Sequence, residues 1–503
     1  MKDQNKNPDL KKRDKPDDYF GDWKWREGLA ELMVPIVGKL YRDGINILMY
    51  GNSLVNQSPT DIMKSHRFIR RVEDSEISEL ETYPFLKYLE TQDLSDCEID
   101  LGEIVVDFMN ENVSFDEQNI EQYIQNRVVQ PLSTSTNTRP DTPKDIVLFG
   151  FGRIGRLITR IMAEKTGPGN YYKLKAIVVR KGSSENDLLK RASLLRRDSV
   201  HGAFSGTIRV DTDNDLLVVN GNPIKLLYAN SPDELNYSDF DIIDPILIDN
   251  TGAWRDTQGL KKHLDAGASK VVLTAPGKGD MKNIVYGIND HNLDSKDNLV
   301  SAASCTTNAI VPVLKIVNDE FAIENGHIET VHAYTNDQNL IDNYHKGDRR
   351  GRSAPLNMVI TSTGAVKAVS KALPELEGKL SGNAIRVPIP NVSLAVMNLN
   401  LKNYTTRNEF VNFLQFTAFK SKYREIIGYV NSTEIVSSDF YSSPYACVID
   451  SQATIVNKNS VTLYVWYDNE YGYSVQVVNL VKKLAGIKML RLPIKDWKIF
   501  FWI

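Results

Sequence analysis

The stretch DIVLFGFGRIGR, residues 145–156, joins a short apolar run to a glycine-rich turn and then to the start of a helical pattern. The run 145–149 predicts a buried strand. In this strand–loop–helix context, Gly150 allows a tight turn, Gly152 lets the backbone approach a pyrophosphate, and Gly155 permits close helix packing. The helix start favours negative charge. The stretch therefore predicts a Rossmann domain with a dinucleotide site; a glycine-rich turn without a cofactor is the alternative.

The next predicted strand, residues 175–179, bears on which dinucleotide is bound. In NAD-dependent proteins of this fold the strand ends near an acid that binds the ribose 2′-hydroxyl. Here Arg180 and Lys181 follow instead. Without a carboxylate a 2′-phosphate is not repelled, and cations can bind it through charge-assisted hydrogen bonds. This favours NADP, or the use of both cofactors, over strict NAD; a solvated strand end is the alternative.

A second informative stretch is ASCTTN, residues 303–308, which precedes apolar residues at helical spacing. Cys305 is thus predicted at a helix start, where the helix dipole and unpaired N–H groups favour the nucleophilic thiolate. An inert core cysteine is the alternative. Downstream, a β-like run ends at His332, one of seven histidines, which is the residue type best suited to act as a base beside a thiol.

Together these strings resemble one enzyme family. GFGRIGR, SAASCTTN, HAYTNDQ, RVPIPNVS and WYDNEYGYS occur in the order and at the spacing typical of glyceraldehyde-3-phosphate dehydrogenase, over about residues 143 to 486. The resemblance implies a Rossmann domain plus an α+β catalytic domain with an antiparallel sheet. It also implies that Cys305 attacks an aldehyde, that His332 moves the protons, and that inorganic phosphate resolves the thioester.

The resemblance assigns further residues to the site. The cofactor contacts would be Gly150, Gly152, Arg153, Ile154, Gly155, Arg180, Lys181, Thr251, Gly252, Thr274, Asn469 and Tyr473, with Asn469 orienting the nicotinamide carboxamide. The inorganic-phosphate site would comprise Ser304, Thr307, Thr363 and Gly364, and the substrate-phosphate site Thr335, Asp337 and Arg386. Arg350 is the expected phosphate contact in a basic loop, with a solvated loop as the alternative. Asn343-Tyr344, where NAD-specific relatives tend to carry Leu-Pro, mildly supports NADP.

Composition limits the other possibilities. The 503 residues are 42% hydrophobic, with a net charge of −4 and a pI near 6.1, which supports a soluble protein and gives no basic field for nucleic acid. Cysteines at 97, 305 and 447 lack metal-type spacing and suit a reducing compartment. No signal-like segment or 18-residue uncharged apolar run occurs. We expect a cytoplasmic protein without a metal or a transmembrane segment, and by resemblance a homotetramer.

The predicted domains are a disordered tail (1–16), a mainly helical module (17–130), a linker (131–143), the dinucleotide domain (144–304, completed by a helix at 475–487), the catalytic domain (305–474) and a C-terminal tail (488–503). Helical spacing and capping residues predict module helices near 29–41, from Ser58-Pro59 and after Ser114. Pro35 should kink or restart the first. Extended bacterial members of the family that the chain resembles also carry such an added module. We expect the module either to cover apolar surface or to bind a partner. The tail docks on the protein, is disordered, or touches a membrane.

Two other functions stay open. Erythrose-4-phosphate dehydrogenase shares the fold but tends to lack the Thr of HAYT and the Ser-Thr-Gly segment, and this chain has both, at Thr335 and at residues 362–364. A binding or regulatory protein that uses the helical module is the other alternative. Intact Cys305 and His332 argue against loss of catalysis.

Overall fold

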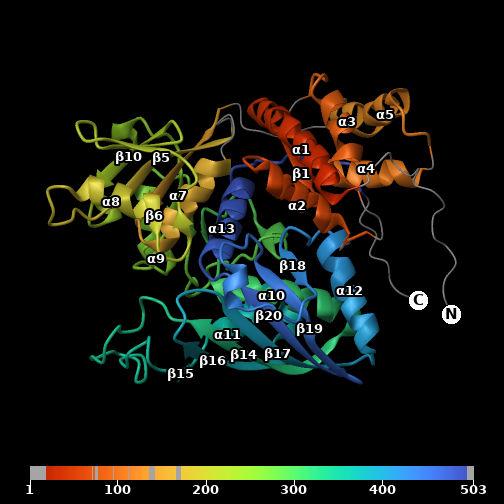
Figure 1. The fold of residues 1–503 in the computed structure, drawn as a ribbon. Coiled ribbons are helices and arrows are strands. Elements are labelled where there is room, and N and C mark those ends of the chain that lie inside the picture. The colour runs from red at the N-terminus through yellow and green to blue at the C-terminus, as the bar shows by residue number, and fades with distance from the viewer. Residues whose placement is uncertain are drawn as a thin grey trace. The chain divides into compact units, whose positions relative to one another are not determined.

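The computed structural model describes residues 18–70, 72–73, 77–94, 96–111, 113–134, 142–165 and 171–495. The chain forms two compact units: residues up to 137 together with 489–496, and the remainder from 138 to 488 (Figure 1). The tail predicted at residues 1–16 lies outside the described residues, as do the last residues of the predicted C-terminal tail.

The first half of the larger unit is a Rossmann-type sheet with helices on both faces. Strand β4 shows why: Ile146 and Leu148 pack with α7 and α13, whereas Val147 and Phe149 pack toward α9. The strand order is β13-β12-β11-β4-β5-β10-β9-β8. The strands are β4 (Lys144–Phe149), β5 (Tyr172–Val179), β8 (Ile208–Asp211), β9 (Leu216–Val219), β10 (Asn222–Tyr228), β11 (Ile246–Asp249), β12 (Lys270–Leu273) and β13 (Leu299–Ser301), and the helices are α7 (Arg153–Lys165), α8 (Asp187–Arg196) and α9 (Thr257–Asp265). A small ribbon adds β6 (Arg197–Asp198) and β7 (Gly202–Ala203).

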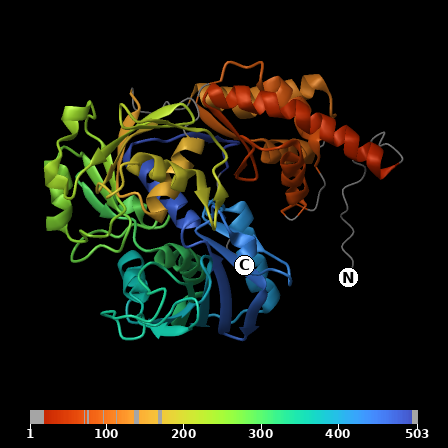
Figure 2. The same ribbon diagram turned by 60° about the vertical axis from the view of Figure 1, so that its left-hand side comes forward.

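The second half is a seven-stranded sheet in the order β15-β16-β14-β17-β20-β19-β18. Its central strands pair antiparallel as predicted, but β16 runs parallel to β14, and β18 parallel to β19, so the sheet is mixed. Helices α10 to α12 contribute to its apolar core, and Figure 2 shows this part from a second side. The elements are α10 (Cys305–Phe321), β14 (Ile323–Ala333), β15 (Val359–Thr361), α11 (Ala365–Ala372), β16 (Leu380–Val387), β17 (Ser393–Leu401), α12 (Arg407–Lys420), β18 (Ile427–Val430), β19 (Cys447–Asn457) and β20 (Ser460–Tyr467).

The last long helix, α13 (Tyr471–Leu484), returns to the dinucleotide half. Val477, Val478 and Val481 on this helix are buried with Ile146 and Ile158 of that half. The residues between β20 and α13 therefore connect the two halves of the larger unit.

The smaller unit has a core of its own around a four-stranded sheet in the order β2-β1-β3-β21. The predicted helices are present, but the sequence patterns missed the strands, the three helices α3, α4 and α6, and a π-helical turn. Its elements are α1 (Tyr19–Arg42), β1 (Ile45–Met49), β2 (Asn52–Ser53), α2 (Pro59–Ile69), α3 (Glu79–Leu89), β3 (Cys97–Asp100), α4 (Leu101–Asn110), α5 (Glu117–Ile124), a π-helical turn (Gln125–Val129), α6 (Gln130–Ser133) and β21 (Leu490–Leu492).

Three details depart from the predictions for this unit. Helix α1 runs through Pro35 without a restart, because burial of residues such as Met33, Ile36 and Val37 offsets the lost backbone hydrogen bond. Helix α6 extends into the predicted linker. Within the predicted C-terminal tail, residues 490–492 form β21, which pairs parallel with β3. None of the helices in the described part of the chain combines the length and apolar character needed to cross a membrane.

Candidate active site

Cys305 is the first residue of α10, as predicted. Ser304 caps the helix, and its Oγ accepts a hydrogen bond from the backbone N–H of Thr307 at 3.0 Å. Such a cap satisfies one of the N–H groups that the first turn leaves unpaired. The sulfur therefore lies at the positive end of a seventeen-residue helix.

The backbone before the cysteine is held in an uncommon conformation. Ala303 is buried and has φ +56°, which costs a residue with a Cβ about 1–3 kcal/mol. The Tyr473 hydroxyl donates to the Ala303 carbonyl at 3.1 Å, and the Asn308 amide donates to the carbonyls of Ala302 and Ser304 at 2.8 and 2.9 Å. Tyr473, predicted as a cofactor contact, thus fixes the backbone that presents Cys305.

The structure brings His332 to the cysteine. His332 is 5% exposed near the end of β14, and its Nε2 lies 3.6 Å from Sγ of Cys305. The His332 ring also packs edge-on against the Tyr467 ring, with 6.0 Å between centroids. The Tyr467 hydroxyl is 3.0 Å from Oγ1 of Thr306, a contact that sequence patterns gave no means to foresee. A thiol and an imidazole are therefore adjacent, as the motif pair predicted.

Arg386 completes this cluster. In the parallel β14–β16 pairing, Arg386 is the direct partner of His332. Its Nη1 donates to the Ala333 carbonyl at 2.9 Å and lies 2.8 Å from Nδ1 of His332. Arg386 was predicted only as a substrate-phosphate contact. The strand register gives it a second set of contacts on the far side of the base.

Burial and Arg386 together control the protonation of the pair. Burial, with help from the Arg386 charge, lowers the pKa of His332 to about 3. Burial raises the pKa of the Cys305 thiol, and the Arg386 guanidinium opposes that rise only in part. Both directions favour a neutral imidazole beside a neutral thiol. The sequence predicted a thiolate here; the helix start and the Arg386 charge favour that form, whereas burial of the sulfur raises the pKa of the thiol and opposes it.

The residues predicted for inorganic phosphate lie at the starts of two helices, α10 and α11. The hydroxyls of Ser304 and Thr307 are 2.7 Å apart on the first turn of α10. Thr363 Oγ1 accepts from the N–H of Ala365, and Gly364 is the residue before α11. Backbone N–H groups and hydroxyls of this kind donate to phosphate oxygens.

Residues predicted for the substrate phosphate include charged groups that act on Arg386. Arg350 pairs with the Asp337 carboxylate and donates to Thr361 Oγ1 at 3.0 Å. The charges of Arg350 and Asp337 also act on the pKa of Arg386, which burial lowers. Thr335 follows β14 two residues beyond Ala333. Two guanidinium groups with one carboxylate give this region a local positive charge, which suits the phosphate contact that the resemblance predicts.

The glycine turn has the geometry that a dinucleotide pyrophosphate needs. Gly150 has φ +102°, and a Cβ at Gly155 would stand 2.5 Å from the Gly150 carbonyl oxygen. Helix α7 starts at Arg153, so its first N–H groups, including that of Ile154, point out of the turn. The Arg153 guanidinium itself pairs with Glu470 and Asp198. These residues fit a dinucleotide, with Arg153 contributing through its backbone.

The other predicted cofactor residues lie at ends of the same sheet. Thr251 donates through its N–H and its hydroxyl to Asp249 at 2.7 Å, and the Thr274 hydroxyl donates to the Asp249 carbonyl at 3.1 Å. Gly252 has φ +60°. All three follow strands β11 or β12, where doubly wound sheets bind their ligands.

The end of β5 is more mixed in charge than the sequence suggested. Arg180 and Lys181 are exposed there, and Lys181 Nζ lies over the Tyr228 ring at 5.7 Å. The Asp187 carboxylate also reaches this turn, because a Cβ at Gly182 would stand 2.4 Å from its Oδ1. Arg191 neutralises it, donating to Asp187 at 2.7 Å and to the Arg180 carbonyl at 2.8 Å.

Asn469, predicted beside the nicotinamide, is buried and connected to the base. Ser393 Oγ donates to Oδ1 of Asn469 at 2.9 Å and accepts from the N–H of Ala333 at 3.1 Å. Ser393 was not predicted, although it ends the quoted string RVPIPNVS; no local pattern distinguishes a bridging hydroxyl from a solvated one. The neighbouring Glu470 links Arg153 to His201, whose Nε2 is 3.0 Å away.

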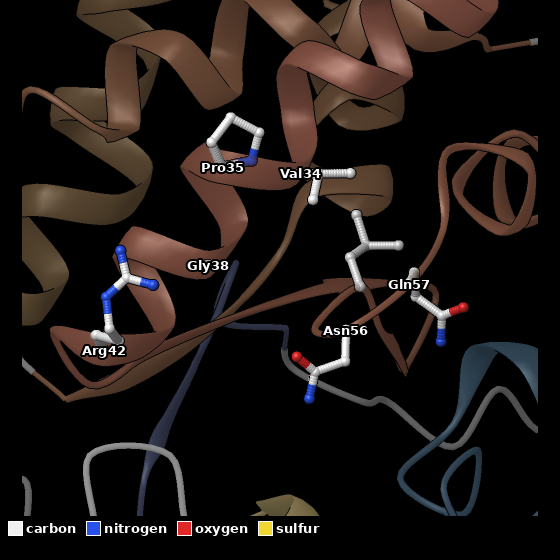
Figure 3. A pocket seen from close by; sticks show the side chains of 7 residues that line it. Val34, Pro35, Gly38, Arg42, Asn56 and Gln57 are labelled. Atoms are coloured by element: carbon white, nitrogen blue, oxygen red, sulfur yellow. The ribbon is translucent and has the colours of Figure 1, made fainter. Parts of the chain in front are cut away.

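The smaller unit contains a hollow of its own. It measures about 340 Å³ and is lined by Val34, Pro35, Gly38, Arg42, Leu54, Asn56 and Gln57 (Figure 3). Arg42 and Asn56 are exposed, so its polar lining is solvated. Within the described ranges no cluster of His, Cys, Asp or Glu has the arrangement of a metal site.

Comparison with known proteins gives the following matches. Residues 144–257 match the family model for the NAD binding domain of glyceraldehyde 3-phosphate dehydrogenase, and residues 304–469 match that for its C-terminal domain. A glyceraldehyde-3-phosphate dehydrogenase-like protein of Pseudomonas aeruginosa (strain UCBPP-PA14) is 53% identical over 466 residues, which cover 92% of this chain and 100% of that protein. Glyceraldehyde-3-phosphate dehydrogenase 2 of Bacillus subtilis (strain 168) is 39% identical over 344 residues, 68% of this chain and 96% of that protein. Glyceraldehyde-3-phosphate dehydrogenase of Zymomonas mobilis is 38% identical over 343 residues, which cover 68% of this chain and 98% of that protein.

The alignments differ in how much of this chain they cover. The two shorter alignments leave about a third of this chain unmatched. The longer one, at 92% of the chain, has to include most of the smaller unit. The smaller unit is thus shared with at least one relative and is not peculiar to this chain.

Proposed function

Because the chain belongs to the glyceraldehyde-3-phosphate dehydrogenase family, we propose that it catalyses the reversible, phosphorylating oxidation of D-glyceraldehyde 3-phosphate to 1,3-bisphosphoglycerate with NADP or NAD. The observation that carries this proposal is the 3.6 Å contact between Cys305 Sγ and His332 Nε2 at the start of α10. A thiol, a base and two sets of phosphate-binding groups are what acyl transfer from an aldehyde to phosphate requires.

The side chains act in sequence. Cys305 attacks the aldehyde carbon and forms a C–S bond, while the thiol proton passes through His332 to the aldehyde oxygen. The resulting hydroxyl gives its proton to Nε2 when the carbon is oxidised, which leaves a thioester on Cys305. Inorganic phosphate held by Ser304, Thr307, Thr363 and Gly364 then attacks the thioester carbon. The C–S bond breaks, and His332 returns its proton to the departing sulfur.

The dinucleotide supplies the hydride acceptor when it is bound. The chain would hold it through the glycine turn and the start of α7, with Thr251 and Thr274 at the strand ends and Asn469 at the nicotinamide. Arg180 and Lys181 support NADP, because both are exposed at the end of β5. The Asp187 carboxylate in the same turn is paired with Arg191, which reduces its repulsion of a 2′-phosphate.

The decisive test is Cys305→Ala. The variant should lose phosphate-dependent reduction of NADP and NAD with glyceraldehyde 3-phosphate, while its dinucleotide dissociation constants stay within about twofold of native, since the sulfur is the nucleophile only. Retained turnover would refute the covalent mechanism. Ser381→Ala is the control variant, because the Ser381 hydroxyl is exposed and contacts His327. Ser301→Ala is less suitable, since Ser301 accepts a hydrogen bond from the Ala303 N–H.

A second substrate is supported more weakly. Erythrose 4-phosphate has the same aldehyde and phosphate ends, so the same cysteine could oxidise it. Thr335 and Thr363 favour the three-carbon substrate by resemblance. The ratio of kcat/KM for the two aldehydes decides this choice, and a ratio in favour of erythrose 4-phosphate would reverse it. We also expect a homotetramer, which light scattering on the purified chain tests.

A further inference from the structure

A buried carboxylate holds two of the residues predicted to contact the dinucleotide. Asp249 is the last residue of β11 and is 0% exposed. Its Oδ1 accepts from the N–H and the hydroxyl of Thr251, both at 2.7 Å. Its backbone carbonyl accepts from the N–H and the hydroxyl of Thr274, at 3.0 and 3.1 Å. One residue therefore fixes both threonines just beyond the carboxyl ends of β11 and β12, where doubly wound sheets bind their ligands.

The second oxygen of this carboxylate has a partner on a helix. His263 lies in the last turn of α9 and is also buried, and its Nε2 is 3.3 Å from Oδ2 of Asp249. An ionised carboxylate only accepts hydrogen bonds, so the ring donates to it through Nε2. A buried carboxylate that lacks donors is costly. His263 therefore supplies a third donor to the charged group that holds Thr251.

Two aromatic rings keep the His263 ring in this orientation. Phe149, at the end of β4, packs edge-on against it with 4.9 Å between centroids, and Trp254 does so at 5.7 Å. Those two rings also pack against each other at 5.6 Å. In the described part of the chain, Nδ1 of His263 is buried without a hydrogen-bond partner. The contact with Asp249 is therefore the single polar contact that the structure shows for this ring.

The surroundings of Asp249 make this contact stronger than a surface hydrogen bond. Tyr237 is buried nearby; burial raises the pKa of its hydroxyl, and the Asp249 charge adds to that rise. The charge of Asp249 thus acts through a region that contains little water. A hydrogen bond in such a region is electrostatically stronger, and an unpaired acceptor there is more costly, than at the surface. Loss of the His263 donor should therefore disturb the turn that Asp249 holds.

We propose that Asp249 and His263 are positioning residues of the dinucleotide site: His263 holds the Asp249 carboxylate, and the carboxylate fixes the turn that presents Thr251 and Gly252 to the cofactor. This inference rests on the proposed function, in which those two residues contact the dinucleotide. Neither Asp249 nor His263 belongs to the strings that carry the family resemblance. The turn follows β11, whereas the cations predicted for a 2′-phosphate follow β5, so the pair should affect binding of NADP and of NAD equally.

Titration calorimetry of the full chain with NADP and with NAD tests this role. His263→Leu removes the donor and leaves Oδ2 of Asp249 buried without it, so both dissociation constants should rise about tenfold. His263→Gln, whose amide N–H can take the place of Nε2, should stay within about twofold of native. His291→Leu makes the same change at an exposed histidine of the same unit and should behave like native. Unchanged dissociation constants in His263→Leu would overturn the proposal.

A second measurement separates positioning from general support of the fold. Acylation of Cys305 by p-nitrophenyl acetate, in which the sulfur takes the acetyl group and p-nitrophenolate leaves, needs the thiol but no dinucleotide. His263→Leu should be acylated within about twofold of the native rate. In turnover it should show a raised KM for the dinucleotide and a kcat within about twofold of native, as expected when only binding is weakened.

Slower acylation together with weaker dinucleotide binding would mean that His263 only supports the fold, and would overturn the proposal. His263→Asn, whose shorter amide should not reach Oδ2 of Asp249, replaces the leucine variant if that variant does not fold. A native protein that binds neither dinucleotide would overturn the proposed function. Dinucleotide binding by the native protein that neither His263→Leu nor His263→Asn weakens would overturn this inference alone, so the two failures are distinguishable.

Discussion

The two units of the chain each contain a buried histidine, His66 and His332, and the difference between their surroundings shows which of them suits the proposed role of a base. His66 on α2 is 1% exposed, with Nδ1 2.8 Å from the Ile62 carbonyl and Nε2 2.7 Å from Oγ1 of Thr82. His332 is 5% exposed, with Nε2 directed at the Cys305 sulfur. Burial lowers the pKa of both rings. A lowered pKa is thus common to the two, and only the second ring faces a group that can react.

The surroundings reinforce the contrast. Around His66, the carboxylate of Glu79 lies 3.3 Å from Nδ1 and pairs with Arg26 at 2.7 Å, and both carboxylate oxygens and both ring nitrogens have partners. Around His332, Nδ1 lies beside the Ala333 carbonyl and Arg386 Nη1, and Nε2 faces Cys305, which is only partly covered. A fully satisfied buried network stabilises a fold, whereas a ring nitrogen that faces a partly covered thiol lies next to a group that a ligand can reach.

The largest expected effect is that of His332→Gln, for which His66→Gln is the control. His332→Gln removes the proton acceptor next to the sulfur, so kcat/KM with glyceraldehyde 3-phosphate should fall about 10² to 10⁴-fold. His66→Gln should leave kcat/KM per folded molecule within about twofold, because no contact of His66 reaches the reacting atoms. Thiol alkylation titrates the active molecules, so that kcat/KM is expressed per folded molecule. Equal losses of kcat/KM in the two variants would contradict the distinction between the two histidines.

A buried carboxylate in the smaller unit should matter to stability and not to turnover. Asp100 is 0% exposed and accepts from the N–H groups of Tyr50 and Gly51 and from Arg491 at 2.8 to 3.0 Å. Asp100→Ala leaves these donors without that acceptor, so it should destabilise this unit by about 3 kcal/mol. Hydrogen exchange of the full chain, followed by mass spectrometry of peptides from β1 and β3, measures the loss.

The control for Asp100 is another helix cap in the same unit. Asp116 caps α5 as Asp100 caps α4, but it is exposed. Asp116→Ala should cost about 1 kcal/mol, the ordinary effect of losing a cap. A loss of kcat in Asp100→Ala comparable to its loss of stability would show that the smaller unit takes part in catalysis.

The motifs predicted those parts of the site whose requirements are local. Gly150 and Gly155 need particular backbone space within a few residues, and Cys305 needs only a helix start, so sequence alone placed them. The contact of Arg386 with Nδ1 of His332 was not foreseeable, because it depends on the parallel register of β14 with β16. The same holds for Ser393, whose partners Ala333 and Asn469 come from separate segments.

The fold was predictable to a similar limit. Alternation and helical spacing identified the Rossmann domain and the longer helices of the smaller unit. They missed β21, because three residues show no period and their partner β3 lies near the other end of the chain. They also overestimated the effect of Pro35 on the helix, since α1 has buried apolar residues both before and after this proline. Tertiary packing decided these points against local preference.

The pH dependence of the smaller unit should follow His66. Burial is the main cause that lowers its pKa in the folded state, and the Glu79 carboxylate only partly opposes it. The unfolded chain then binds more protons once the pH falls below the ordinary histidine value of about 6.5, so stability should fall with decreasing pH by at most about 1.4 kcal/mol per unit. Hydrogen exchange of α2 and α3 peptides at pH 7 and pH 5.5 measures the slope, and His66→Gln should flatten it. An unchanged slope in that variant would assign the effect to other groups.

The smallest expected effect concerns the cofactor, and it tests whether exposure at a strand end makes a cation functional. Arg180 is exposed after β5, and its carbonyl is held by Arg191 at 2.8 Å, so its backbone is fixed while its side chain is solvated. A solvated cation contributes modestly to phosphate binding, because much of its charge is screened. Arg180→Ala should therefore lower the ratio of kcat/KM for NADP to that for NAD by about three- to tenfold, chiefly through KM for NADP. Arg209→Ala, which removes an exposed charge from β8 of the same sheet, should leave the ratio unchanged. If the native enzyme strongly prefers NAD, and Arg180→Ala does not alter that preference, then Asp187 and not the cations determines the specificity of this turn.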